Sequence, residues 1–196
     1  MTAPVMSRYF RHQPCEPGVE LYPPRPGDRE RSYVIVEPGN RIPRNLAVHE
    51  AGHYVVGAGL GLAVERPRLL ADESGAICGG RVSLGPDDQT RGPRDRKVWE
   101  RADAEARQNG SLLLAALYVA GYHAELLASA LVPLSGVIAC EGVDLYHAEK
   151  WLSRAGFPPK TGLIYSQKLA DSILRACWKD VVEVAAEVAA RPPERD

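Results

Sequence analysis

Two histidines with a glutamate between them are the feature that most constrains how this chain can fold. They lie in the segment His49-Glu50-Ala51-Gly52-His53. On a helix, positions i and i+4 share one face, so both imidazoles can reach a single metal ion. Glu50 follows His49 directly, where its carboxylate can hold a metal-bound water instead of the metal. The pattern therefore predicts the first half of a zinc hydrolase site.

The residues around this pattern are apolar, which indicates that its helix is largely buried. They include Leu46, Val48, Val55 and Val56. A polar group buried without a partner costs roughly 2–7 kcal/mol, and a metal ion would supply such a partner directly. The alternative is a pair of buried structural histidines that are satisfied by hydrogen bonds alone.

Composition places the chain among ordinary globular proteins. Its 196 residues suffice for one domain with extensions, and 45% are hydrophobic and 25% charged. The net charge of −1 gives no electrostatic basis for binding nucleic acid or an anionic membrane surface. The cysteines are far apart and never form a C-x-x-C pair, which is typical of reduced thiols in a cytoplasmic protein. We therefore expect a cytoplasmic location and no nucleic-acid partner.

The most apolar stretch, residues 112–139, is interrupted by His123, Glu125 and Pro133. Ionisable side chains near the middle of a membrane span are costly in lipid. The sequence therefore predicts a buried core helix here, followed by a loop, and no membrane span.

Prolines divide the chain into three parts. Residues 1–42 are rich in proline and arginine, so we expect an extended N-terminal arm, with a short strand near residues 33–36. A second copy of the chain or a partner protein could bind through this arm. Residues 43–190 are expected to form the domain, and residues 191–196 a tail.

The expected fold class is mainly α (α+β), with a small β-hairpin beside the HExxH helix. The expected helices cover residues 43–60, with Pro43 in the first turn, then residues 111–131, with Ser111 as N-cap, residues 142–154 and residues 161–190. The expected strands are residues 64–71 and 76–84, which are joined by a turn at 72–75. Residues 85–94 read as a loop, and residues 95–108 as a solvated helix at best.

A catalytic zinc site usually has three protein ligands, so one more ligand is expected downstream of the helix. The candidates are His123, Glu125, Glu141, Asp144 and His147. Asp144 begins a predicted helix just after Gly142, where a carboxylate is held rigidly. It could instead serve only as a helix N-cap or first-turn acid. Spacing alone leaves Asp144, His147 and the glutamates as alternatives.

The segment Ala47–Val56 resembles the zinc helix of the peptidase domain of FtsH-type ATP-dependent metalloproteases, which reads H-E-A-G-H-A. Residues Ala120–Glu125 occupy the position of the family's G-G-R-A-A-E segment, with Tyr122 in place of its arginine. Residues Val143–Leu145 occupy the position of its N-D-L segment, with Val143 in place of its asparagine. The resemblance covers roughly residues 43–190, in the family's order.

This resemblance implies a helical zinc-peptidase domain with His49, His53 and Asp144 as ligands of Zn²⁺. It further implies that Glu50 is the catalytic base and that Glu125 orients a zinc-bound histidine. The sequence contains no Gly-x-x-x-x-Gly-Lys-Ser/Thr phosphate loop. We therefore expect an ATP-independent endopeptidase that cleaves flexible or unfolded polypeptide, or one specific partner protein.

Two alternatives remain open at this point. The chain could be a regulatory or binding protein that keeps the peptidase fold without proteolysis, although Glu50 would then have no chemical purpose. It could also be a repressor-cleaving HExxH regulator protease, for which a glutamate would be the expected third ligand. For a peptidase, the strand at 76–84 could bind an extended substrate along its edge, or it could be an internal strand of a small sheet.

Overall fold

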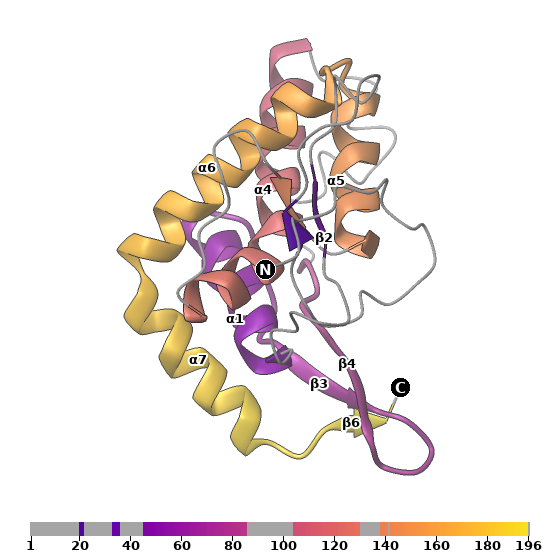
Figure 1. Ribbon diagram of the computed structural model, residues 1–196, viewed down its shortest axis with the longest axis vertical. Coiled ribbons are helices and arrows are strands. Elements are labelled where there is room, and N and C mark those ends of the chain that lie inside the picture. The colour runs from indigo at the N-terminus through magenta and orange to yellow at the C-terminus, as the bar shows by residue number, and fades with distance from the viewer. Residues whose placement is uncertain are drawn as a thin grey trace.

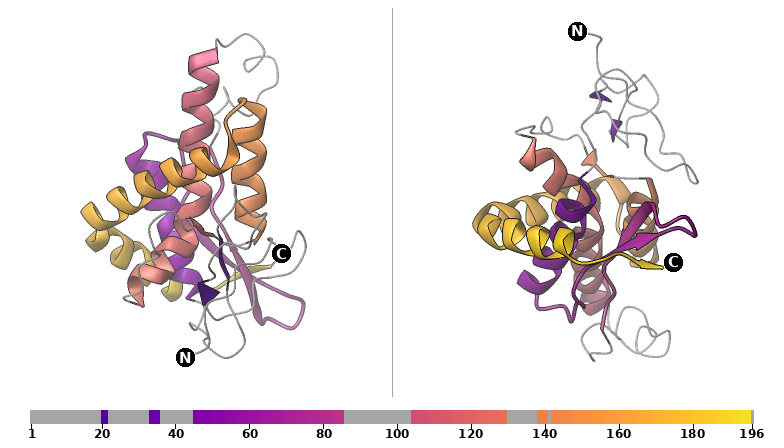
Figure 2. Two further views of the ribbon diagram at one scale, coloured as in Figure 1. Left: turned by 45° about the horizontal axis from the view of Figure 1, so that its top comes forward. Right: turned by 90° about the horizontal axis from the view of Figure 1, so that it is seen from below.

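The computed structural model describes residues 20–21, 33–35, 45–85, 104–129, 138–140 and 142–195. This part of the chain is mainly helical, which confirms the expected fold class (Figures 1 and 2). Its helices are α1 (Leu46–Gly59), α4 (Ala104–Ala128), α5 (Gly142–Arg154), α6 (Pro159–Ala176) and α7 (Trp178–Ala190). Residues 86–94 of the predicted loop at 85–94, and most of the predicted N-terminal arm, lie outside the described residues.

Helix α1 carries the HExxH pattern and begins slightly later than expected. The side chain of Asn45 accepts a hydrogen bond from the backbone N–H of Val48 at 3.2 Å, so Asn45 is the N-cap. An asparagine cap satisfies one of the unpaired N–H groups at a helix start. Pro43 therefore precedes the helix and does not form its first turn. Beyond the other end, Gly61 has a φ of 72°, which favours glycine.

Helix α4 forms the centre of the domain and packs against α1, α5 and α6 (Figure 1). Its contact with α1 is so close that a Cβ atom on Gly52 would lie 2.6 Å from Cβ of Ala124. It would also lie 2.8 Å from the carbonyl oxygen of Ala120. Glycine and alanine thus bring the two helices together, and this contact positions the histidine-bearing helix on α4.

The start of α4 corrects the sequence analysis. The helix begins at Ala104, so Ser111 lies inside it, fully buried, and is not its N-cap. Residues 104–108 are mostly good helix formers, and Glu105 interacts favourably with the N-terminal end of the helix dipole. Residues 104–108, the described part of the predicted charged segment, therefore belong to the core helix.

Residues Glu105–Ala128 of α4 are long and apolar enough to cross a membrane, judged by length and composition. However, 72% of the most apolar window lies buried inside the protein. The core helices of globular proteins meet the same criteria, so this finding is weak evidence for a membrane span.

The expected last helix is wrong in one respect, because two helices occupy its range. Helix α6 ends at Ala176 and α7 starts at Trp178, with Cys177 between them at φ −111° and ψ 27°. This non-helical residue turns α7 toward α1, against which α7 packs. The predicted apolar stripe of α7 is part of the core, as its buried residues are Val181, Val184, Ala185 and Val188.

The expected hairpin is present with shorter strands, β3 (Arg68–Ala71) and β4 (Ile77–Arg81), which pair antiparallel. Strand β6 (Glu194–Arg195) pairs parallel with β3 on its other side, so the sheet order is β4-β3-β6. The segment expected to be a tail therefore completes a sheet.

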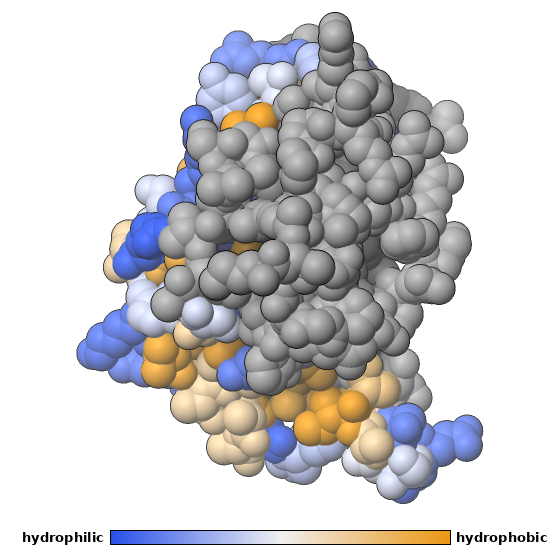
Figure 3. Space-filling view, in the orientation of Figure 1, coloured by the Kyte–Doolittle hydropathy of each residue, from blue (hydrophilic) through white to orange (hydrophobic). Residues whose placement is uncertain are grey.

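In Figure 3, hydrophobic residues gather near the lower end of the face, where α1 and β3 lie in Figure 1.

A second small sheet has the order β1-β2-β5, with β1 at Glu20–Leu21, β2 at Tyr33–Ile35 and β5 at Ile138–Ala139. Strand β2 coincides with the short strand predicted near residues 33–36. It pairs parallel with β5, so the short segment before α5 is tied to a strand from the predicted arm.

Candidate metal centre

His49 and His53 project from the same face of α1, and Asp144 in the first turn of α5 meets them. The two Nε2 atoms lie 3.0 Å apart. Oδ2 of Asp144 lies 3.3 Å from Nε2 of His49 and 3.4 Å from Nε2 of His53. These three side chains form a group that could hold a metal ion. The structure thus brings together the three residues that the sequence analysis proposed as ligands.

The second nitrogen of each imidazole has an acceptor that defines the tautomer. Nδ1 of His53 lies 2.6 Å from the carbonyl oxygen of Leu117, which can only accept, so this nitrogen carries the hydrogen. Nδ1 of His49 lies 2.6 Å from Oε1 of Glu125 and donates to that carboxylate in the same way. Both Nε2 atoms consequently face Asp144, and a bound metal ion would take the place of any proton on them, as in metal-bound histidines.

Glu125 also anchors the start of α1. Its Oε2 accepts a hydrogen bond from the backbone N–H of Asn45 at 3.2 Å. One buried carboxylate on α4 therefore fixes both the N-terminus of α1 and the ring of His49. The sequence analysis expected Glu125 beside a ligand histidine, and the structure places it there.

Two glycines allow close approach at the site, and the sequence analysis missed both roles. A Cβ atom on Gly121 of α4 would lie 2.5 Å from Nε2 of His49 and also clash with His53. A Cβ atom on Gly80 of β4 would lie 2.5 Å from Oε1 of Glu50. The two imidazoles therefore lie directly against the backbone of α4 at Gly121, and the carboxylate of Glu50 lies directly against the backbone of β4 at Gly80. The available signal was the Gly79-Gly80 pair inside a predicted strand, since such glycines often mark a close approach.

Burial is uneven around the group. His49, Glu50 and His53 are 2%, 5% and 7% exposed. The side chain of Asp144 is 18% exposed and is the most open of the three possible ligands. The group is therefore enclosed by α1 and α4 and opens on the side of α5.

Hydrogen bonds and charge interactions within the group offset the cost of burying its charged side chains. With no metal bound, burial lowers the pKa of His49, but its hydrogen bonds to Asp144 and Glu125 outweigh that effect and raise the pKa to about 10. Burial also opposes the charged form of His53, yet the nearby Asp144 raises its pKa above the ordinary value. For Asp144, burial would raise the pKa, but His53 and His49 hold it well below its usual range. The site therefore favours a positive charge beside Asp144, which either protons or a cation can supply.

The other candidates for the third ligand lie elsewhere. His123 contacts Asp171, with 2.8 Å between Nε2 and Oδ1, on the α6 side of α4. His147 stacks on Tyr118 with ring centroids 5.2 Å apart. Glu141 lies outside the described residues. Within the described part of the chain, Asp144 is the aspartate that meets both histidines, whereas the regulator-protease alternative expected a glutamate there.

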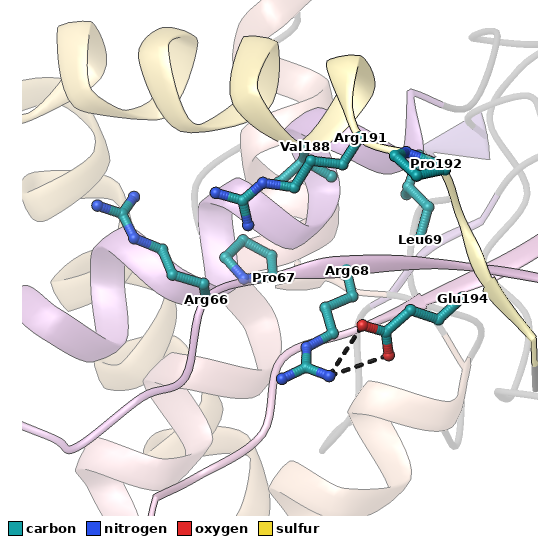
Figure 4. Close-up of a pocket in the computed structure, with 8 residues that line it drawn as sticks. All are labelled: Arg66, Pro67, Arg68, Leu69, Val188, Arg191, Pro192 and Glu194. Carbon is teal, nitrogen blue, oxygen red and sulfur yellow. Dashed lines mark hydrogen bonds and ion pairs between the residues drawn. The ribbon is translucent and has the colours of Figure 1, made fainter.

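A separate cavity of about 270 Å³ lies between β3 and the C-terminal end of α7 (Figure 4). Its lining includes Arg66, Arg68, Arg191 and Glu194 and none of the candidate metal ligands. Nη1 of Arg68 lies 2.9 Å and 3.0 Å from the two carboxylate oxygens of Glu194, and this pair holds β6 beside β3.

Comparisons of the chain with protein-family models, with curated protein sequences and with solved structures found no match. The resemblance to FtsH-type peptidases therefore stays a prediction, and a functional interpretation has to come from the site itself.

Proposed function

We propose that the metal centre holds zinc and that the protein is a zinc-dependent, ATP-independent endopeptidase. The observation that supports this most directly is the convergence of two Nε2 atoms and one carboxylate oxygen at separations of 3.0, 3.3 and 3.4 Å. Ligand atoms about 2.0–2.2 Å from a tetrahedral zinc ion lie roughly 3.3–3.6 Å from one another. Three protein ligands leave one position open, as in catalytic zinc sites.

Glu50 is the proposed base. Bound zinc lowers the pKa of its water to about 7 and polarises a carbonyl oxygen. Glu50 follows His49 on α1, lies outside the proposed ligand set and is 5% exposed, so it can act in a site that excludes bulk water. In this proposal, Glu50 accepts the proton of the attacking water and passes it to the leaving amine. Glu125 and the carbonyl of Leu117 keep the two imidazoles oriented.

The position of β4 supports a polypeptide substrate. In the described part of the chain β4 is the outer strand of its sheet, with β3 on its inner side. Gly80 of β4 borders the carboxylate of Glu50. An extended chain that paired with the outer edge of β4 would therefore pass close to the base. Flexible or unfolded segments, or one exposed segment of a partner protein, would meet this requirement.

The decisive experiment compares wild type with Glu50→Gln on an unfolded casein substrate, with zinc and without ATP. We expect slow cleavage by wild type and none by Glu50→Gln, because an amide cannot accept the proton of the water. The zinc content and the thermal midpoint of the variant should match those of wild type, since Glu50 is not a proposed ligand. Equal cleavage by both proteins would indicate a contaminating protease and favour the binding-protein alternative.

A further inference from the structure

The exposed side of the metal centre lies along α5. The side chains of His49 and His53 are 3% and 9% exposed, compared with 18% for Asp144. Of the three possible ligands, Asp144 in the first turn of α5 is therefore the one that solvent reaches most. A substrate that reached the centre at Asp144 would meet the side chains one turn further along α5.

An aromatic pair occupies this position. His147 follows Asp144 by three residues on α5, and Tyr118 precedes Gly121 by three residues on α4. Each of the two residues thus lies about one helical turn, a rise of about 4.5 Å, from the residue of its own helix that borders the centre. The rings of His147 and Tyr118 stack, with centroids 5.2 Å apart and planes 18° apart, and both side chains are half-buried.

Each residue of this pair has a further aromatic or apolar neighbour. Tyr146 is 39% exposed and meets the ring of His147 edge-on at 5.4 Å. Tyr118 and Leu84, the latter just beyond β4, pack against the same small apolar cluster. The residue just beyond β4 and Tyr118 therefore adjoin the same cluster.

We infer that the stacked His147–Tyr118 pair forms a subsite that selects a large aromatic or apolar side chain next to the scissile bond. This inference rests on the proposed peptidase function and adds a substrate preference to it. Stacked and edge-on ring contacts favour aromatic partners beyond what buried area alone supplies. His147 acts here as a specificity-determining residue, since neither the metal nor the base depends on it.

The test measures binding of two small metal-binding probes, glycine hydroxamate and phenylalanine hydroxamate, to the zinc-loaded full chain by calorimetry. Wild type should bind phenylalanine hydroxamate about tenfold more tightly than glycine hydroxamate. His147→Ala should lose this preference and still bind glycine hydroxamate as wild type does. Tyr165→Ala removes an aromatic residue that is 62% exposed on α6, and it should keep the preference.

The outcomes separate the inference from the proposed function. No binding of glycine hydroxamate by wild type would overturn the zinc centre and the subsite with it. Binding of glycine hydroxamate without any preference for phenylalanine would overturn the subsite alone. If His147→Ala does not fold, His147→Asn keeps a polar side chain without the ring, and an unchanged preference in that variant would also overturn the inference. Sites of cleavage in unfolded casein provide a second readout, because His147→Ala should cut with less preference for large side chains.

Discussion

Glu125 on α4 accepts a hydrogen bond from Nδ1 of His49 on α1 at 2.6 Å, and the two side chains are only 5% and 3% exposed. The same carboxylate accepts the backbone N–H of Asn45, so it joins the start of α1 to a proposed metal ligand. This contact links helix packing directly to the chemistry of the centre.

Replacing Glu125 should weaken metal binding although Glu125 is not itself a proposed ligand. Loss of a carboxylate that orients a metal-bound histidine typically costs about 10–100-fold in metal affinity. We expect Glu125→Ala to show a loss in this range in a zinc competition titration. Glu183→Ala on the exposed side of α7 is the control and should bind zinc as wild type does. Wild-type affinity in Glu125→Ala would show that the contact only supports the fold.

Metal content should distinguish Asp144 from its neighbour His147. Purified wild type should contain about one zinc ion per chain, whereas His53→Ala and Asp144→Ala should lose it. His147→Ala should retain the metal, because its ring stacks on Tyr118 and does not belong to the group of possible ligands. Elemental analysis of proteins purified without chelators would measure this. Retention by Asp144→Ala together with loss in His147→Ala would contradict the proposed ligand set.

Gly121→Ala tests the close approach of α4 to the imidazoles. The added methyl group would meet Nε2 of His49 and of His53, so the rings or the helices have to move. We expect loss of zinc binding and a decrease of about 1–3 kcal/mol in the free energy of unfolding, the usual cost of overpacking. Gly79→Ala is the matched control in β4, where an added Cβ would meet nothing within 4 Å. Urea denaturation and zinc titration of both variants would show whether the effect is confined to Gly121.

The pKa of His49 predicts how pH affects the metal-free protein. Its pKa rises from the ordinary value of 6.5 to about 10 on folding, so the folded state holds this proton more tightly than the unfolded state does. The resulting stabilisation is fully present below pH 6.5 and is lost as pH rises toward 10. Urea denaturation of chelator-treated protein should therefore give a lower free energy of unfolding at pH 9 than at pH 6.5.

Zinc binding should depend on pH in the opposite direction, because the metal has to displace the proton on Nε2 of His49. We expect zinc affinity to rise with pH by up to about tenfold per unit for each proton released. Competition titrations at several pH values between 6.5 and 9 would measure this. A zinc affinity that does not change with pH would show that the metal-free centre holds no proton.

The local sequence was sufficient to predict the elements that depend on the spacing of nearby residues. The i, i+4 spacing of His49 and His53 within an apolar helix follows from helix periodicity alone, because residues one turn apart share a face. The same holds for the apolar stripe of α7 and for the turn between β3 and β4. The boundaries of α5 also match the helix predicted over residues 142–154.

Tertiary structure decided everything that depends on which segments meet. Spacing alone left Asp144, His147 and the glutamates as alternatives, and the packing of α5 on α4 directs Asp144 to the histidines. The packing of α6 on α4 likewise directs His123 to Asp171. Gly121 has no local signature of its role, and the Gly79-Gly80 pair predicts a close approach without its partner, because a close approach is a property of two segments and not of one.

The break between α6 and α7 at Cys177 and the pairing of β6 with β3 could not be predicted from hydrophobic periodicity either. In both cases contacts between segments distant in sequence override a local pattern. The apolar stripe continues past Cys177, yet α7 turns to bury it against α1, and a short polar tail becomes a strand because β3 offers it backbone partners and Arg68 an ion pair. The local pattern thus identified the metal-binding helix, and long-range packing decided which carboxylates and which backbones surround it.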